Sequence, residues 1–211
     1  MILSYRSRYR VDMSNPSCYS SKRIATLVIY MEAKINIFYL SESPKQAAQW
    51  QVDKHVVKMP LESAQMLCTA HRVLDGTETT VLSKTGRKLK AWVLPNKFRN
   101  SLLYKAAHVN HPSSVWCRQS RANYKWLYDH FVALSHEYGQ RYGKCHKSYQ
   151  LLRDELYHAP DNIPDGPFTE PTPAMPTEYI VEGDSIASYR NYYTHAKSDL
   201  HVWKQNKPDW I

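Results

Sequence analysis

Residues 53–67 constrain the fold most, because their polar and apolar side chains alternate with the period of an α-helix. On an ideal helix, His55 and Glu62 lie within about 20° of each other. Polar side chains cover the adjoining arc: Lys54, Lys58, Gln65 and Thr69. Apolar side chains take most of the remaining surface. A carboxylate between a histidine and two lysines on such a helix predicts an acid/base site. The alternative is a surface helix that carries a few solvated charges.

The charge of the chain indicates its class of partner. The 211 residues suffice for one domain with a sizeable core, with or without an appendage. The 28 Lys and Arg outnumber the 19 Asp and Glu, which gives a formal net charge of +9. Together with 16 Tyr and 6 Trp, this favours a nucleic acid, since cations contact phosphates and aromatic faces stack on bases. The alternative is a basic protein with no nucleic-acid role.

Missing motifs disfavour several other classes of protein. No apolar run approaches the roughly 20 residues that span a bilayer, so we expect no membrane association. Signatures of nucleotide hydrolysis, dinucleotide binding and α/β-hydrolase chemistry are absent. His108 and His111 lack a carboxylate or cysteine partner at ligand spacing, so we predict neither a metal nor a cofactor. The cysteines form no CxxC pair and are typical of reduced thiols in the cytoplasm (the host cytoplasm if the chain is phage-encoded): Cys18, Cys68, Cys117 and Cys145.

The chain divides into a leader and a helical part. In residues 1–30, five Lys and Arg face one Asp and no apolar period is sustained. We expect a flexible basic leader, a transit-like segment, or sequence translated ahead of a natural start at Met31. Residues 31–211 are expected to form the α-helical domain.

Helical spacing and capping residues predict the elements of this domain. Residues 35–40 form a short apolar extended segment. Helices are expected over about 45–57, 60–74, 97–108, 112–142, 146–157 and 184–203, with Pro60 either kinking the first or starting the second. Residues 77–90 are expected to be a hairpin arm against DNA or a disordered loop, and residues 159–183 an extended connection. The predicted fold class is all-α, or mainly α.

Several of these residues occur together in one known family. The run from Lys34 to Glu42 reads Lys-Ile-Asn-Ile-Phe-Tyr-Leu-Ser-Glu, Asp53-Lys-His55 follows, and Glu62 comes seven residues after the histidine. The chain ends in Lys-Pro-Asp-Trp-Ile. Between these ends stand His111 with Trp116, and Leu134, Glu137 and Arg141. These features resemble the phage pyrimidine-dimer DNA glycosylase/AP lyase family, endonuclease V. The resemblance covers about residues 34–74, 108–143 and 204–211.

The resemblance implies a single compact helical domain, without a metal, that acts as a monomer on damaged or modified double-stranded DNA. Residues 75–100 and 145–185 have no counterpart and are expected to be loop-rich insertions. In this family the α-amino group of the processed N-terminus attacks the sugar C1′, and the resulting Schiff base permits β-elimination. The implied catalytic residues are Glu62 as acid/base and His55 as its orienter or a phosphate contact. The implied DNA contacts are Lys34, Lys54, Lys58, Gln65, His111, Arg118, Arg121 and Trp210.

The chain also departs from the family pattern. Met31 is followed by Glu32, where the family has a small residue that permits removal of Met. Leu61 and Gln65 stand where the family places two arginines near its catalytic glutamate. Two alternatives therefore stay open: a base-modifying enzyme on the same scaffold, and a non-enzymatic basic nucleic-acid-binding protein.

Overall fold

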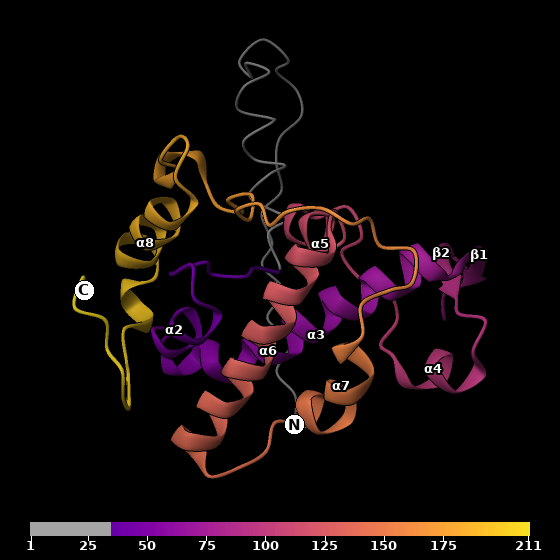
Figure 1. The fold of residues 1–211 in the computed structure, drawn as a ribbon, viewed down its shortest axis with the longest axis horizontal. Helices are drawn as coiled ribbons and strands as arrows, with labels where there is room; N and C mark the ends of the chain where they lie inside the picture. The colour runs from indigo at the N-terminus through magenta and orange to yellow at the C-terminus, as the bar shows by residue number, and fades with distance from the viewer. Residues whose placement is uncertain (1–34) are drawn as a thin grey trace.

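Two long helices form the centre of the structure, a computed structural model that describes residues 35–211 (Figure 1). Helix α3 (Asp53–Asp75) packs across α6 (Arg121–Tyr142), and α2 (Pro44–Gln49) packs against α6. Shorter helices lie around them: α4 (Lys97–Leu102), α5 (Pro112–Cys117), α7 (Lys147–Tyr157) and α8 (Ser185–Ala196). Within the described residues, seven α-helices and one two-stranded sheet confirm the mainly α prediction. None of these helices combines the length and the apolar character needed to cross a bilayer.

Helix α3 belongs to the core. Most of its residues are buried, among them Met59, Glu62 and Met66, so the alternative of a surface helix is wrong. No second helix starts at Pro60, because α3 continues through this residue. A proline inside a helix costs about 3 kcal/mol. Burial of the neighbouring apolar side chains, at about 1.5–3 kcal/mol each, offsets that cost.

Buried arginines break two of the predicted helices by binding their carbonyl oxygens. The helix predicted over 45–57 is divided, because the Arg141 guanidinium donates to the carbonyl oxygens of Gln49 and Gln51, both at 2.8 Å. Likewise α4 ends at Leu102 and not near residue 108. There the Arg72 guanidinium donates to three main-chain carbonyls, those of Asn100, Leu103 and Tyr104. The guanidinium groups thus satisfy carbonyl oxygens that have no intrahelical partner where the helix ends.

The long helix predicted over 112–142 is two helices, α5 and α6, with a break before Arg121. Ser120 caps α6 through its hydroxyl, which accepts the backbone N–H of Asn123 at 3.1 Å. The Asn123 side chain in turn donates to the carbonyl of Trp116 at 3.0 Å and so terminates α5.

The C-terminal half agrees better with the sequence pattern. Helix α7 confirms the helix predicted over 146–157. Residues 159–183 form the expected extended connection, apart from the short 3-10 helix η2 (Thr177–Tyr179). Asp184 caps α8, which begins where the sequence predicts, but this helix ends at Ala196 and not near residue 203. The 3-10 helix η3 (Ser198–Leu200) comes next in the chain. After it, the imidazole of His201 forms a hydrogen bond with the main-chain carbonyl of Tyr193 at 2.9 Å.

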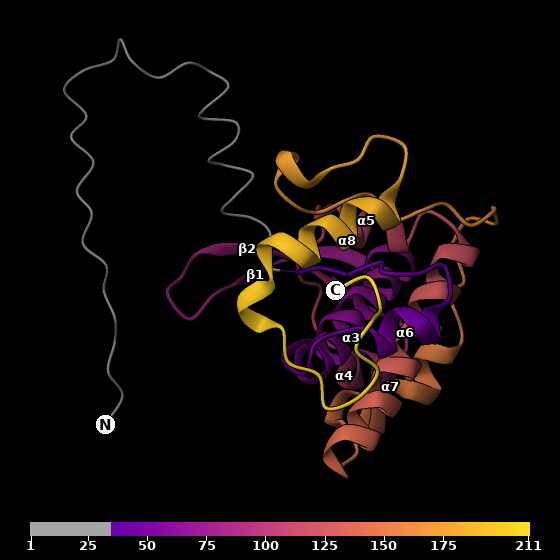
Figure 2. The same ribbon diagram turned by 90° about the vertical axis from the view of Figure 1, so that its left-hand side faces the viewer.

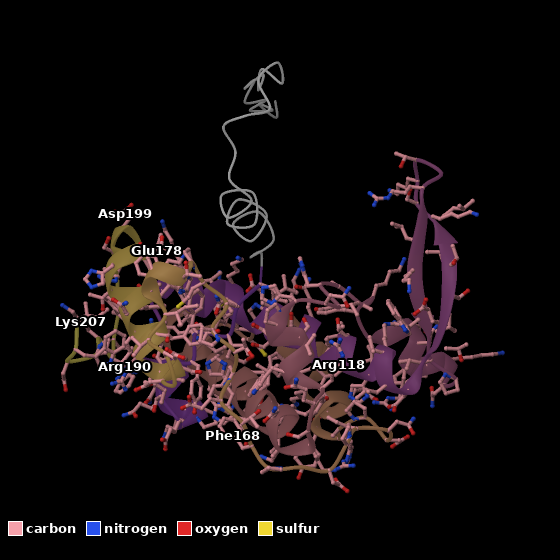
Figure 3. All side chains as sticks on the ribbon, turned by 90° about the horizontal axis from the view of Figure 1, so that it is seen from above. Arg118, Phe168, Glu178, Arg190, Asp199 and Lys207 are labelled. Atoms are coloured by element: carbon pink, nitrogen blue, oxygen red, sulfur yellow. The ribbon has the colours of Figure 1, made fainter. Side chains whose placement is uncertain are left out.

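Residues 77–93 form a hairpin, so the alternative of a disordered loop is wrong. Strands β1 (Thr77–Leu82) and β2 (Lys88–Val93) pair antiparallel, from Thr77 opposite Val93 to Leu82 opposite Lys88. The hairpin projects from the body of the molecule (Figures 2 and 3). The first predicted insertion, 75–100, is therefore not loop-rich, and the second, 145–185, contains α7.

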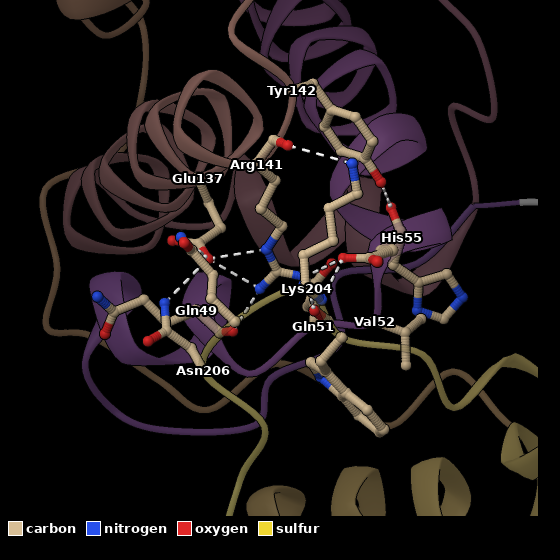
Figure 4. Close-up of polar contacts among 12 residues, drawn as sticks. Gln49, Gln51, Val52, His55, Glu137, Arg141, Tyr142, Lys204 and Asn206 are labelled. Atoms are coloured by element: carbon tan, nitrogen blue, oxygen red, sulfur yellow. Dashed lines mark hydrogen bonds and ion pairs between the residues drawn. The ribbon is translucent and has the colours of Figure 1, made fainter.

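A buried ionic network ties the start of α3 to the end of α6 (Figure 4). The fully buried side chain of Arg141 pairs with Asp53 at 2.9 Å and with Glu137 at 2.8 Å. The C-terminal segment joins this network, since the backbone N–H of Lys204 donates to Asp53 and the Asn206 amide donates to Glu137. The network therefore holds the first turn of α3, which carries His55, in one place.

Candidate functional site

Glu62 lies at the centre of the candidate site, on the buried side of α3. Its side chain is only 6% exposed. One carboxylate oxygen, Oε2, accepts the backbone N–H of Asn36 at 3.0 Å. The other oxygen, Oε1, lies 2.6 Å from Nζ of Lys58, one helical turn earlier, whose side chain is 62% exposed. The carboxylate therefore joins the beginning of the described chain to an amine that faces solvent.

The segment over Glu62 is held in a specific bent conformation. The carboxamide oxygen of Asn36 accepts the N–H groups of Ile37 and Phe38, at 2.7 and 3.0 Å. Its amide nitrogen donates to the carbonyl of Ala174 at 2.9 Å. Phe38 adopts a φ of +54°, which a residue with a side chain rarely does and which costs about 1–3 kcal/mol. This strained residue lies two positions after Asn36, whose backbone N–H binds the buried carboxylate of Glu62.

His55 supports this segment and makes no hydrogen bond or ion pair with Glu62. Seven residues along a helix correspond to about 10 Å, which is too far for a hydrogen bond. Instead the His55 ring stacks on Phe38 with the centroids 4.2 Å apart, and its Nδ1 lies 2.8 Å from the Tyr193 hydroxyl. The N–H of Val52 donates to the same hydroxyl oxygen, so the hydroxyl hydrogen is free to be donated to Nδ1.

Burial sets the protonation state of His55. Burial, together with the smaller effect of the positive charges of Lys197 and Lys58, lowers the pKa of His55 to about 3. The imidazole is therefore neutral at physiological pH. A neutral, buried ring is suited to orienting its neighbours, and the expected alternative of a phosphate contact has no support from this position.

The remaining predicted DNA contacts on α3 and before it differ in exposure. Lys54 and Lys58 face solvent, and Gln65 is half-buried. Lys34 and the predicted leader, 1–30, lie outside the described residues. Of the α3 residues, the two lysines are thus placed to meet a large anionic ligand.

His111 and Arg118 make contacts within the protein. His111 caps α5, and its Nδ1 accepts the backbone N–H of Ser113 at 3.3 Å. Burial, with a contribution from the charge of His108, lowers the pKa of His111 to about 4, so it carries no positive charge at neutral pH. The half-buried Arg118 donates to the carbonyl of Ser114 at 2.9 Å. Their observed contacts are those of structural residues.

Arg121 and Trp210 are also engaged. The Arg121 side chain pairs with Asp165 at 2.9 Å on the surface. Trp210 packs edge-on against Trp50, and the Arg190 guanidinium lies over both rings, 5.1 Å from Trp50 and 5.4 Å from Trp210. The tail tryptophan therefore anchors the end of the chain to the body.

The sequence pattern missed the partners that surround the predicted pair. Tyr193 lies within the helix predicted over 184–203 and Asn36 within the run from Lys34 to Glu42, but the pattern gives neither of them a part in the site. A signal for Asn36 exists, because an amide inside an apolar run needs hydrogen-bond partners when the run is buried. No comparable signal marks Phe38, whose place depends on the folded chain.

Comparisons of the chain with models of protein families, with curated proteins and with solved structures find no match. Within residues 35–211, no three or more His, Cys, Asp or Glu side chains are grouped so that they could hold a metal ion.

Proposed function

We propose that this protein is a DNA N-glycosylase/AP lyase that acts as a monomeric helical domain on damaged or modified double-stranded DNA. The observation that carries the proposal is the hydrogen bond from the Asn36 backbone to the buried carboxylate of Glu62. It shows that the beginning of the helical part passes directly over a carboxylate. An amine nucleophile near this beginning would then lie beside an acid/base group.

The reaction requires an amine and a group that moves protons. A neutral amine attacks C1′ of the deoxyribose, the bond from C1′ to the base breaks, and the base leaves with a proton. The C1′–O4′ bond then breaks as O4′ receives a proton and the ring opens, and the nitrogen, which keeps one proton, forms the protonated Schiff base. Removal of a proton from C2′ then breaks the C3′–O bond. Glu62 would stabilise the sugar cation and carry these protons.

Two amines are candidates for the nucleophile. A chain that began at Ala33 would place its α-amino group three residues from Asn36, within about 11 Å of it even when fully extended. Such an amine titrates near pH 8 and is partly neutral at physiological pH. The other amine is Nζ of Lys58, already 2.6 Å from Glu62.

Borohydride trapping tests the proposal and distinguishes these amines. The 211-residue chain and a shortened chain that begins at Ala33 are each mixed with DNA that carries an abasic site. We expect the short form to give at least tenfold more covalent adduct, because an extension converts its α-amine into an amide, which is a far weaker nucleophile. Mass spectrometry of the adduct locates the attached residue.

Each outcome has a distinct meaning. An adduct on the first residue of the short form supports the α-amine mechanism. Equal adducts from both forms on Lys58 support a lysine nucleophile beside Glu62. No adduct from either form contradicts the lyase proposal, and a modified nucleoside in digests of treated DNA would then favour a base-modifying enzyme.

DNA binding should depend steeply on salt. About four to six phosphate contacts predict a slope of log K against log[salt] near −4 to −5. Lys54→Ala should make this slope shallower by about one unit, because Lys54 is exposed on α3 and has no ion pair in the structure. Fluorescence anisotropy over a salt series measures the slope.

Lys144→Ala is the matched control, since Lys144 is also exposed but lies just after α6 and is not part of α3. It should leave the slope unchanged. A wild-type slope near zero would contradict the nucleic-acid proposal itself.

A further inference from the structure

The β1–β2 hairpin is an exposed arm that has no role in the arrangement of side chains around Glu62. Every residue of β1 is exposed, and within the described part of the chain no third strand pairs with either edge of the ribbon. Large apolar side chains face solvent along its length, with Leu82 the most exposed at 69%: Val81, Leu82, Leu89 and Val93. Apolar side chains gathered in this way on a projecting element indicate a surface that meets a partner.

Hydrogen bonds and a glycine turn close the tip of the arm. The N–H of Ser83 donates to the carbonyl of Arg87 at 2.8 Å, and the Ser83 hydroxyl accepts the N–H of Arg87 at 3.0 Å. Gly86 closes the turn in the left-handed region, at a φ of +78°, which glycine adopts without strain. This loop holds two cations, Lys84 and Arg87, at the end of the ribbon.

The base of the arm is fastened to the core. The buried Arg72 donates to the carbonyl of Trp92 at 2.9 Å. Gly76 joins α3 to β1, and a Cβ there would lie 2.4 Å from the carbonyl oxygen of Arg72, so a larger residue would disturb the junction. The ribbon is therefore attached to α3, the helix that carries Glu62.

The charge of the arm favours an anionic partner. Its single carboxylate, Glu78, pairs with Lys90 at 2.8 Å. The other cations have no ion pair in the structure: Lys84, Arg87 and Lys88. Cations beside exposed apolar side chains suit DNA, where phosphates flank grooves that also expose sugars and thymine methyl groups.

The arm and the candidate site share one face of the molecule. In Figures 2 and 3 the indigo segment that begins at Ile35 starts between α8 and the hairpin, on the face from which the hairpin projects. This segment passes over Glu62 through Asn36. A long ligand held by the arm would therefore extend across the site.

We propose that the β1–β2 hairpin enters the major groove of double-stranded DNA beside the nucleotide on which Glu62 acts. This inference rests on the proposed function, because it takes DNA as the partner. The major groove is about 12 Å wide and admits a two-stranded ribbon, whereas the minor groove is only about 6 Å wide and would have to widen at a cost in DNA deformation. The cations Lys84 and Arg87 contact phosphates at its edges.

The test compares two double variants of the full chain. Lys84→Gln with Arg87→Gln removes the charge of the tip, and Lys144→Gln with Lys147→Gln removes the same charge at the connection of α6 and α7. Both pairs are exposed, so both variants should fold, as circular dichroism will check. The readouts are the salt slope of binding and methylation of guanine N7, a major-groove atom, by dimethyl sulfate.

We expect the tip variant to make the salt slope shallower by about two units and to lose the protection of guanine N7 that the wild type gives. The control pair should change neither. Unchanged slope and protection in the tip variant would overturn the inference while leaving the proposed function intact. Protection of adenine N3 alone would place the arm in the minor groove and overturn it too.

Two further results would overturn the inference in other ways. If the tip variant bound DNA normally but lost a self-association seen for the wild type by sedimentation, the ribbon would be a contact between copies of the chain. If the wild type did not bind DNA at all, the proposed function and this inference would both fail. The wild-type binding curve thus separates the failure of one from the failure of both.

Discussion

Glu62→Gln is expected to reduce turnover on abasic or damaged DNA by about two or more orders of magnitude, with little change in DNA affinity. The amide has the shape of the carboxylate, and its oxygen still accepts the N–H of Asn36. It cannot accept and return a proton, and it no longer neutralises a developing sugar cation. Single-turnover kinetics measure the rate, and anisotropy measures the affinity.

Glu178→Gln provides the matched control, because Glu178 is exposed on η2 and its substitution removes the same charge. It should retain full activity. Full activity of Glu62→Gln on DNA that the wild type cleaves would show that the site is assigned wrongly. An equal loss of binding and rate would show that Glu62 holds the segment at Asn36 and has no chemical role.

Local sequence signals correctly predicted the start of those helices that an adjacent residue caps. Helix α7 begins after His146, whose side chain caps it, and α8 begins after the capping carboxylate of Asp184. The errors lie where distant residues compete for the backbone. Arg72 and Arg141 bind carbonyl oxygens some 30 and 90 residues away, and no local pattern reveals such contacts.

The candidate site shows the same division between local and distant information. The seven-residue spacing of His55 and Glu62 correctly placed both on one helix, and both are buried. Their partners come from elsewhere: Asn36 and Phe38 from the first segment, and Tyr193 from α8. The resemblance also implied DNA contacts for Arg118 and Arg121, but it could not show that Ser114 and Asp165 engage them.

The position of the site also depends on Arg141, whose removal should have the largest effect on stability. Arg141→Met leaves Asp53 and Glu137 without their buried cation and exposes the carbonyls of Gln49 and Gln51 to an apolar neighbour. Breaking a buried pair in this way costs about 3–5 kcal/mol, a large share of the roughly 5–15 kcal/mol that stabilises a domain. Equilibrium urea unfolding measures this loss through the shift in midpoint.

Arg153→Met is the control for this substitution, since Arg153 lies exposed on α7 and its replacement should leave the urea midpoint nearly unchanged. A loss below about 1 kcal/mol in Arg141→Met would mean that water or a rearranged Lys204 replaces the guanidinium. If the expected loss occurs, the first turn of α3 should loosen together with the C-terminal segment, because Asp53 also accepts the N–H of Lys204. Hydrogen exchange should then rise at residues 53–56 and 203–206 together, while α7 keeps its protection.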